Sequence, residues 1–395
     1  MKDHRILFLN QVAGPLFREL AEDISIAFGE GELFSGHMDD IAREMSPTLD
    51  IVPGPDYDRR NLLTRAWSWS RFFFGALHKT FKSSPDRLLF IVSNPPFLPL
   101  VGWLASVLRG QRYCLLVYDV YPAVLIKLGK ISQRGPVAML WRAFNRLVWS
   151  RAEVVFTIGE HMAANMRLEA PKMESSRVQV VPIWVDVDFI KPIPQRENPF
   201  LISLGWQERK IVLYSGNLGN THNLDGLLKA AQQLKDRSYI GFLIIGSGAL
   251  WDKLEAEVNG KAMENVKLLP FQPEHMLPQT LPAGDISIVS MEAAIAGFMI
   301  PSKTFYYMAA GSALVALVPS SCEVADVVEE GGCGVRLDPD NSDEIADAII
   351  ALVDDPVRLS SYKSKSRQLA ETHYSRVNTA HYIKVLKEVI STEPS

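Results

Sequence analysis

The chain has 395 residues, of which 47% are hydrophobic and 22% are charged, a composition typical of folded globular domains. Its length indicates about two domains, and its formal net charge of -4 gives no overall positive field of the kind that nucleic-acid-binding proteins use. Cys114, Cys322 and Cys333 have neither the spacing of a zinc site nor that of a disulfide framework. We therefore expect a two-domain protein without a metal, a cofactor or a nucleic-acid partner.

The amino-terminal segment MKDHRILFLNQ has too short an apolar stretch for a secretory signal, so a cytoplasmic protein is expected. Residues 88–108, LLFIVSNPPFLPLVGWLASVL, are long enough for a transmembrane helix, but Pro95 and Pro96 would break that helix near its middle. A buried strand that ends at Ser93, followed by a turn and an apolar helix, is the better interpretation.

Short apolar runs alternate with longer helix-like segments, which indicates parallel sheets with helical crossovers. The proline-rich stretch 186–206 has no clear period and is predicted as the interdomain linker, and residues 356–390 are predicted to be helical. The pattern predicts an α/β fold of two doubly wound domains facing each other across a cleft, with ligands at the carboxyl ends of the strands. Strands are predicted at residues 5–10, 88–93, 113–119, 153–159 and 177–183, and then at 210–216, 240–248, 265–271, 286–291 and 313–318.

The segment AGFMIPSKTFYYMAAG, residues 296–311, is the strongest candidate for a ligand site. Pro301 to Lys303 have the pattern of a helix start, and Gly311 would end that helix. The unpaired N–H groups and partial positive charge of a helix start suit a diphosphate, and Lys303 adds a full charge. The spacing alone also fits an ordinary capped helix with an exposed lysine.

Two glycine-rich turns follow predicted strands in the second half. Gly216 allows the backbone to come close to a ligand, and Asn217 and His222 can offer hydrogen-bond donors. Gly246 and Gly248 repeat this arrangement after the next strand. Neither turn matches a P-loop or a dinucleotide-binding motif, so ordinary tight turns remain the alternative.

In the first half, the candidate residues again follow strands. Gly14 lies in the loop after the first strand, where an NAD-binding motif would need three glycines, which argues against an NAD-dependent enzyme. Asp119 would project from the carboxyl end of a strand into the cleft, as a base or as a partner of a sugar hydroxyl. The alternative role for Asp119 is to cap a turn ahead of Pro122.

Residues 59–82, RRNLLTRAWSWSRFFFGALHKTFK, interleave Arg and Lys with Trp67, Trp69 and four phenylalanines. This mixture suits a helix that lies on the surface of an anionic bilayer. A helix packed on its own sheet is the alternative, and one face could pack inward while the cations face lipid.

Taken together, these segments resemble the retaining glycosyltransferases of the GT-B fold, family 4 of the sequence-based classification. Within that family, the likeness is to bacterial enzymes of cell-envelope polysaccharide assembly of the N-acetylfucosaminyltransferase type. It extends over nearly the whole chain, through SNPPFLPLVGWLA, VYDVYPAVLIKLG, VFTIGEHMA, VVPIWVD, LYSGNLGNTHN, LIIGSG, LLPFQPEHMLPQTLPAGDISIV and GFMIPSKTFYYMAAG. The resemblance implies an acceptor-binding Rossmann-like domain at 1–192, a donor-binding one at 193–374, and a helix at 375–395 that returns to the first domain.

The resemblance also implies roles for particular residues. Asp119 and Lys303 would be catalytic, and Ala296 and Tyr306 stand where the family often has two glutamates, with Glu292 as a candidate substitute for the first of them. Contacts to the ribose and the donor sugar are therefore less well defined than those to the phosphates. The implied donor site contains Gly216, Asn217, His222, Gly246, Gly248, Phe271, Gln272, Gly297, Ser302, Lys303 and Thr304, with the base near Phe271 and Gln272, and the implied acceptor side contains Gly14 and Asn94.

The implied reaction is metal-independent transfer of a sugar, with retention, from a nucleotide diphosphate sugar such as a UDP-sugar to a lipid-linked or glycan acceptor. Lys303, the helix start and the glycine-loop amides would stabilise the leaving diphosphate. The expected location is the cytoplasm, on the inner face of the cytoplasmic membrane, through residues 59–82. Two alternatives are a sugar-nucleotide 2-epimerase of the same fold and a non-catalytic partner subunit that recruits enzymes to the membrane.

Overall fold

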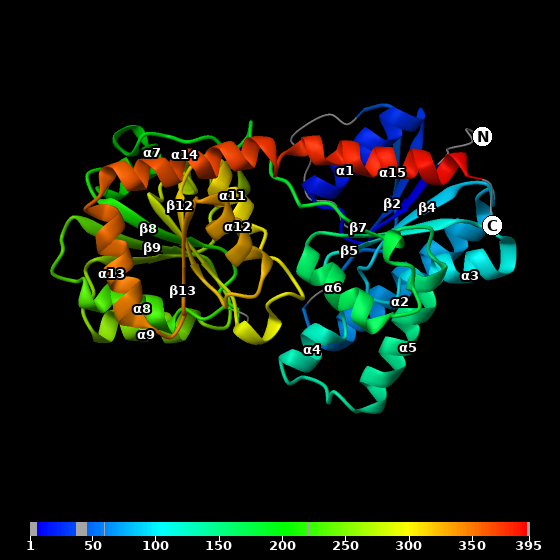
Figure 1. Ribbon diagram of the computed structural model, residues 1–395, viewed down its shortest axis with the longest axis horizontal. Helices are drawn as coiled ribbons and strands as arrows, with labels where there is room; N and C mark the ends of the chain where they lie inside the picture. Colours follow the sequence, from blue (N-terminus) through cyan, green and yellow to red (C-terminus); the bar gives the residue numbers. More distant parts are fainter. Residues whose placement is uncertain (1–5, 37–45, 59, 220–221, 393–395) are drawn as a thin grey trace. The chain divides into compact units, whose positions relative to one another are not determined.

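The computed structural model describes residues 6–36, 46–58, 60–219 and 222–392, which form two compact units (Figure 1). One unit contains the chain up to Pro182 together with the residues from Arg376 onward, and the other contains Ile183–Ser375. Parts of the predicted segments lie outside the described residues, namely Arg5, Arg59, Asn220, Thr221 and residues 393–395.

The first unit is built on a seven-stranded parallel sheet in the order β3-β2-β1-β4-β5-β6-β7. Figure 1 shows α1 and α15 on one face of this sheet and α2, α3 and α5 on the other. The strands are β1 (Ile6–Leu9), β2 (Gly31–Ser35), β3 (Leu49–Pro53), β4 (Leu88–Val92), β5 (Tyr113–Val117), β6 (Val155–Thr157) and β7 (Val178–Val180). The main helices are α1 (Pro15–Phe28), α2 (Leu62–Lys82), α3 (Pro99–Arg109), α4 (Ala123–Lys127), α5 (Pro136–Arg151), α6 (Glu160–Glu169) and α15 (Thr379–Ser391).

The second unit is built on a six-stranded parallel sheet in the order β10-β9-β8-β11-β12-β13. Its strands are β8 (Lys210–Ser215), β9 (Ile240–Ile245), β10 (Val266–Leu269), β11 (Ile286–Ser290), β12 (Ala313–Leu317) and β13 (Gly334–Leu337). Its main helices are α7 (Pro199–Leu204), α8 (Asp225–Gln233), α9 (Trp251–Gly260), α10 (Leu277–Thr280), α11 (Lys303–Ala309), α12 (Glu323–Gly331), α13 (Ser342–Val353) and α14 (Pro356–Thr372).

Both sheets are Rossmann-like, with central strands that are buried on both faces. Every residue of β1, β4, β5, β9, β11 and β12 is buried, as expected for strands covered by helices on both faces. In each sheet the strand order reverses next to the first strand of the unit, between β1 and β4 and between β8 and β11. Loops at the carboxyl ends of these strands flank the switch point where ligands of such sheets bind. The predicted α/β fold is confirmed.

Three strands, β2, β3 and β13, were not predicted from the sequence. Each carries a charged residue that breaks the apolar run: Glu32, Asp50 and Arg336. Glu32 is buried because Lys79 and Arg87 pair with its carboxylate, at 2.7 Å for Arg87. A buried ion pair of this kind cannot be inferred from the strand alone.

The predicted linker at 186–206 is also more structured than its lack of period indicates. It contains α7, whose first turn is capped by the Asn198 side chain, which accepts hydrogen bonds from the backbone N–H groups of Phe200 (2.9 Å) and Leu201 (3.3 Å). Pro199 stands at the first helical position, where its missing N–H costs nothing. Phe200 and Leu201 are buried, so this helix is anchored to the second unit.

The structure confirms two further predictions. Residues 88–108 form β4 and most of α3, and no helix in the described part of the chain is long and apolar enough to cross a membrane. The last helix, α15, packs against α1 in the first unit. Just before α15, Arg376 pairs with Glu22 (2.7 Å) and Asp23 (2.6 Å) of α1.

Candidate active site

The two glycine-rich turns lie side by side at the carboxyl edge of the second sheet. The Gly216 N–H donates to the Ile245 carbonyl and the Leu218 N–H to the Ser247 carbonyl, each at 2.9 Å. A Cβ atom at Gly246 would lie 2.0 Å from the Gly216 carbonyl oxygen, so only glycine permits this approach. The two turns, which are separate in the sequence, therefore form one hydrogen-bonded pair of loops.

Lys303, the first residue of α11, reaches the same place. Its ammonium donates to the Tyr214 hydroxyl at 2.7 Å and lies 3.9 Å from the centre of that ring. Gly216 has a φ of +148°, and a Cβ atom there would stand 2.9 Å from the Lys303 Nζ. The glycine thus provides both the backbone conformation and the space that Lys303 occupies.

Tyr307 fastens α11 to the end of β8. Its hydroxyl accepts from the Ser215 N–H at 2.7 Å and donates to the Ser215 carbonyl at 2.9 Å. Tyr307 and Lys303 lie four residues apart, on one face of the helix. The two bonds fix the helix start that carries Lys303 against the loop that carries Gly216.

The charge of Lys303 is poorly compensated. Burial lowers the pKa of its ammonium from 10.5 to about 7. Among the described residues, no carboxylate lies within ion-pair distance of it, and its hydrogen-bond partner is the neutral Tyr214. A half-buried ammonium without a counter-charge favours the binding of an anion.

His222 completes this edge on the side of β11. Its Nδ1 lies 2.7 Å from the Ser290 carbonyl oxygen, and because a carbonyl only accepts, Nδ1 must carry the hydrogen. Burial, and next the positive charge of Lys303, lower the pKa of His222 to about 4. The ring is therefore neutral at pH 7, and its Nε2 is an acceptor, which suits a sugar hydroxyl better than a phosphate.

The other donor-site residues differ in how accessible they are. Ser302 is exposed, whereas Thr304 is fully buried and its hydroxyl has no hydrogen-bond partner among the described atoms. Phe271 follows β10 and is 53% exposed, and Gln272 beside it donates to the Pro270 carbonyl at 2.9 Å. Gly297 has a φ of +78° in the loop between β11 and α11. Asn217 lies in the glycine loop, and its carbonyl accepts from the Tyr214 hydroxyl at 2.8 Å.

The positions of the two family glutamates lie near the same helix. Ala296 and Tyr306 are both half-buried, Ala296 before α11 and Tyr306 within it. Glu292, the candidate substitute, follows β11 at the carboxyl edge and is half-buried. Tyr214 and Tyr307 were not predicted as site residues, because strand and helix tyrosines at these positions look like ordinary core residues in the sequence.

The three first-unit candidates follow neighbouring strands at the carboxyl edge of the first sheet. Gly14 precedes α1, Asn94 follows β4, and Asp119 follows β5. The Gln11 N–H donates to the Asn94 carbonyl at 3.5 Å, which connects the loops after β1 and β4. The strand order β1-β4-β5 therefore brings these loops to one part of the edge.

Asp119 lies in a small hollow of about 20 Å³, lined by Ser93, Pro96, Trp141 and Trp149 among others. Burial raises the pKa of its carboxyl group to about 6. Tyr121 stacks on Trp141, with ring centres 5.7 Å apart, and forms part of the same wall. A carboxyl group in this setting can exchange a proton near neutral pH, which is the property of a general base.

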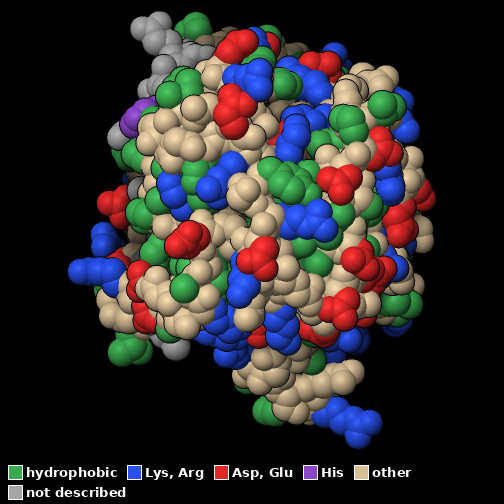
Figure 2. All heavy atoms as spheres, turned by 90° about the vertical axis from the view of Figure 1, so that its left-hand side faces the viewer, with side chains coloured by type: hydrophobic (Ala, Val, Ile, Leu, Met, Phe, Trp, Pro, Cys, Tyr) green, Lys and Arg blue, Asp and Glu red, His purple; other side chains and the backbone are tan. Residues whose placement is uncertain are grey.

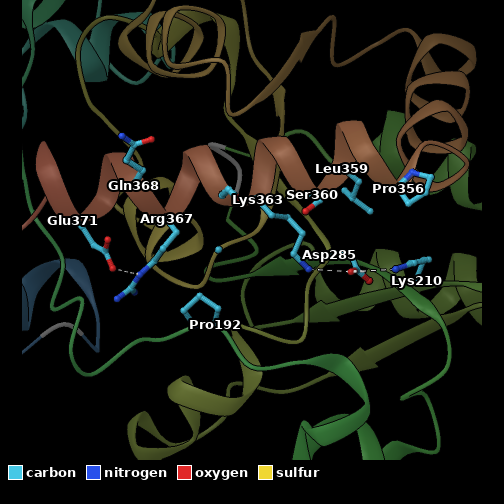
Figure 3. A pocket seen from close by; sticks show the side chains of 12 residues that line it. Pro192, Lys210, Asp285, Pro356, Leu359, Ser360, Lys363, Arg367, Gln368 and Glu371 are labelled. Carbon is cyan, nitrogen blue, oxygen red and sulfur yellow. Dashed lines mark hydrogen bonds and ion pairs between the residues drawn. The ribbon is translucent and has the colours of Figure 1, made fainter.

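A larger pocket, of about 570 Å³, lies elsewhere, at the start of the strands and under α14 (Figure 3). Its centre is the buried Asp285, which accepts from the Lys363 Nζ at 3.1 Å and the Ile211 N–H at 3.1 Å. The Gln195 amide donates to the same carboxylate, and Lys210 lies 3.7 Å away. We interpret this network as structural, since ligands of such sheets bind at the opposite edge.

Replacing Asp285 with Ala should therefore lower the free energy of unfolding by about 2 to 3 kcal/mol, because a buried N–H and an amide lose their acceptor. Lys210 and Lys363 are partly exposed, so water can solvate their ammonium groups in this variant, which limits the loss of stability. Urea unfolding measures the change. Asp225→Ala, which removes an exposed pair with Lys253, is the matched control and should cost less than 1 kcal/mol. Equal losses in the two variants would contradict the structural role.

Within the described ranges, no group of three or more His, Cys, Asp and Glu side chains is arranged to hold a metal ion. The three cysteines are buried and unpaired.

Comparison with known proteins agrees with this architecture. Residues 32–184 match the family described as "Glycosyl transferase 4-like domain", and residues 209–355 match "Glycosyl transferases group 1". The probable glycosyltransferase WbjE of Pseudomonas aeruginosa is 25% identical over 336 residues, covering 84% of this chain and 82% of that protein. The putative colanic acid biosynthesis glycosyl transferase WcaI of Escherichia coli (strain K12) is 26% identical over 336 residues, covering 84% of this chain and 80% of that protein.

Among solved structures, the Anabaena protein HepE in complex with UDP-glucose has a TM-score of 0.69 at 17% identity. The match covers 97% of this chain and 99% of HepE, and it supports the fold. Together, the two family matches include most of both sheets, the glycine loops and α11. The chain thus belongs to the group 1 glycosyltransferases, family 4 of the GT-B fold.

Proposed function

We propose that this chain transfers a sugar, with retention, from a UDP-sugar to a lipid-linked or glycan acceptor in cell-envelope polysaccharide biosynthesis. The donor binds at the carboxyl edge of the second unit and the acceptor at that of the first. The observation that carries this proposal is Lys303, a cation without a carboxylate partner in the described structure, held beside two glycine loops.

A bound diphosphate would supply the negative charge that is missing next to Lys303. Its oxygens would receive a charge-assisted hydrogen bond from Lys303 and bonds from backbone N–H groups that the glycines leave accessible. Fixed donors directed at the charge that develops on the leaving group are the largest catalytic contribution in many enzymes. We propose that Lys303 supplies this stabilisation without a metal ion. Asp119 would act on the acceptor hydroxyl as a base or as its hydrogen-bond partner.

The choice of donor and pathway draws on the relatives. The UDP-glucose complex of HepE supports a UDP-sugar, with the base near Phe271 and Gln272 at the end of β10. The description of WcaI supports polysaccharide biosynthesis. His222 fits the donor sugar, since its neutral Nε2 can accept from a hydroxyl.

The helix α2 supports a membrane-bound acceptor. Its inner face is buried through Ser68, Phe72, Ala76 and Thr80, and Phe72 stacks on Phe34 of β2. The outer face exposes large apolar side chains to solvent. These are Leu63 (84% exposed), Trp67 (68%), Phe74 (65%) and Phe81 (37%), which we call the outer stripe of α2. The packed inner face fits a helix on its own sheet, and the exposed outer face supports the proposed contact with lipid.

Charge is distributed very unevenly along the chain, in a way that favours an anionic partner for this region. Residues 59–152 contain 15 Arg and Lys against two Asp and no Glu, whereas the rest of the chain contains 26 Arg and Lys against 43 Asp and Glu. By contrast, the side of the second unit that faces left in Figure 1 has positive and negative side chains interspersed (Figure 2). We propose that α2, with α3 beside it and α5 beside α3, contacts anionic lipid.

The test of the donor assignment is a thermal-shift screen of UDP, GDP, ADP and CDP in the presence of excess EDTA. UDP at 100 times its dissociation constant should stabilise the protein by ~2.7 kcal/mol. Release of UDP from a UDP-sugar should then require an acceptor and should continue in EDTA. Loss of release in EDTA, restored by Mg²⁺ or Mn²⁺, would contradict a metal-independent reaction.

The same assay separates the alternatives. A 2-epimerase would interconvert two UDP-sugars without an acceptor. A non-catalytic membrane-recruiting subunit, which the absence of the family glutamates at Ala296 and Tyr306 would fit, would bind none of the four nucleotides.

A further inference from the structure

The contact between Lys303 and Tyr214 holds the ammonium in one place. The Tyr214 hydroxyl donates its hydrogen to the Asn217 carbonyl at 2.8 Å, so only its lone pairs face Lys303. It accepts from the Lys303 ammonium at 2.7 Å, and the ring lies under the same nitrogen. Tyr214 is fully buried, which fixes the orientation of both groups.

The titratable groups that face Lys303 in the described part of the chain are uncharged near pH 7. From β8, burial raises the pKa of Tyr214 far above its usual range. From α11 itself, Tyr307 is buried, bonded to Ser215, and likewise has a raised pKa. From the loop after β8, His222 has a pKa of about 4. Among the described residues, therefore, none supplies a counter-charge, and a bound anion would be the first one.

We propose that Tyr214 is the positioning residue of Lys303, and that binding of the donor diphosphate is coupled to the uptake of a proton by Lys303. This inference rests on the proposed donor site. The proton comes from solvent, the neutral amine accepts it, and the ammonium then pairs with a phosphate oxygen while keeping its bond to Tyr214.

The direction of the effect follows from burial and charge. Burial lowers the pKa of Lys303 to about 7 in the free protein, and an anion in contact raises it because opposite charge favours the charged form. At pH 8, above this pKa, the neutral amine is the main form of Lys303 in the free protein, so binding should be accompanied by net proton uptake. The apparent Kd should be flat below pH 7 and rise up to about tenfold per pH unit above it.

The experiment is isothermal titration calorimetry with UDP-glucose, whose diphosphate diester stays fully ionised around neutral pH. At pH 8, the measured heat should change in proportion to the ionisation enthalpy of the buffer, because the buffer releases the proton that Lys303 takes up. In Lys303→Arg, whose guanidinium stays charged, the heat should no longer depend on the buffer. The Kd of this variant should also lose its rise above pH 7.

The role of Tyr214 is tested by Tyr214→Phe, which keeps the ring and removes the hydroxyl. Without its acceptor, the Lys303 ammonium is less stabilised in the free protein, so the break in the pH profile of Kd should move to lower pH. A purely structural tyrosine would change Kd equally at all pH values. Tyr239→Phe, which removes an exposed hydroxyl in the same unit, is the control and should behave as wild type.

The outcomes separate the two proposals. Binding of UDP-glucose by wild type with buffer-independent heat at pH 8 would overturn the proton coupling and leave the donor site in place. An unshifted pH profile in a folded Tyr214→Phe variant would overturn the positioning role. Failure of UDP-glucose and UDP to bind at any pH would refute the donor assignment and the coupling with it.

Discussion

Replacement of Lys303 by Met or Ala is expected to weaken UDP binding roughly ten- to a hundredfold, the equivalent of about 1.5 to 3 kcal/mol for a hydrogen bond to a charged group. The methionine variant keeps the aliphatic stem of the side chain and removes only the charge and the donor. The Tyr214 hydroxyl keeps its bond to the Asn217 carbonyl in this variant. Equilibrium binding of UDP at pH 7 measures the effect.

The same variant should be at least as stable as wild type in the absence of UDP. The pKa of Lys303 falls from 10.5 to about 7 on folding, so the unfolded chain binds more protons between these values and wild-type stability rises with pH there. The advantage of Lys303→Met should therefore be greatest at pH 7 and below, and should disappear towards pH 10. Urea unfolding at several pH values measures it.

Binding and stability thus move in opposite directions, which distinguishes a ligand-binding lysine from a structural one. Lys229→Met, on the exposed side of α8, is the control and should alter neither quantity. An unchanged Kd in folded Lys303→Met would remove the observation on which the donor site rests. A large loss of stability without UDP would show instead that Lys303 supports the fold.

The sequence predicted most of the fold because its strands are apolar runs with long crossovers. The strands it missed are those in which charge interrupts the run, and Glu32 shows the reason. Its burial depends on Lys79 and Arg87, which come from α2 and from the residue before β4 and are distant in sequence. Local patterns carry no information on a partner 47 or 55 residues away.

The candidate site was predictable to the extent that it follows strand ends. Gly216 and Gly246 could be placed at one edge from their strands, but their direct contact depends on two adjacent loops that only the fold brings together. Tyr214 could not be recognised, because an aromatic residue in a buried strand fits the core equally well. For Thr304, the place of the residue in the motif does not reveal that its side chain is buried.

The sequence of α2 showed that it is basic and aromatic but not which residues face outward. Arg65 appeared equivalent to Arg71 in the sequence. In the structure, the Arg65 guanidinium lies 5.9 Å from the centre of the Trp69 ring and its Nε is buried, whereas Arg71 is exposed. Lys79 pairs with Glu32 and is likewise engaged. The exposed cations near the outer stripe include Arg71 and Lys82, and these are the residues to change.

Changing Arg71 and Lys82 together to Glu should weaken binding to vesicles rich in anionic lipid at least tenfold. Each cation near such a surface contributes roughly 1 kcal/mol, and reversal of its charge adds repulsion. Wild-type binding should fall as salt screens the attraction. Changing Trp67 and Phe74 together to Ser should also weaken binding, but this loss should persist in high salt because it removes apolar contact. Vesicle co-sedimentation at two salt concentrations measures both effects.

The control for the charge variant is Lys229→Glu with Lys235→Glu, which makes the same change in net charge on exposed positions of the second unit. If charge location matters, this control should keep wild-type vesicle binding, because attraction at a bilayer falls off within a Debye length. Both charge variants should retain UDP binding, since neither changes the glycine loops or α11, while transfer to a lipid-linked acceptor in membranes should fall only in the α2 variant. Equal weakening of vesicle binding by the two pairs would mean that net charge alone is responsible, and would leave the outer stripe of α2 without a role at the membrane.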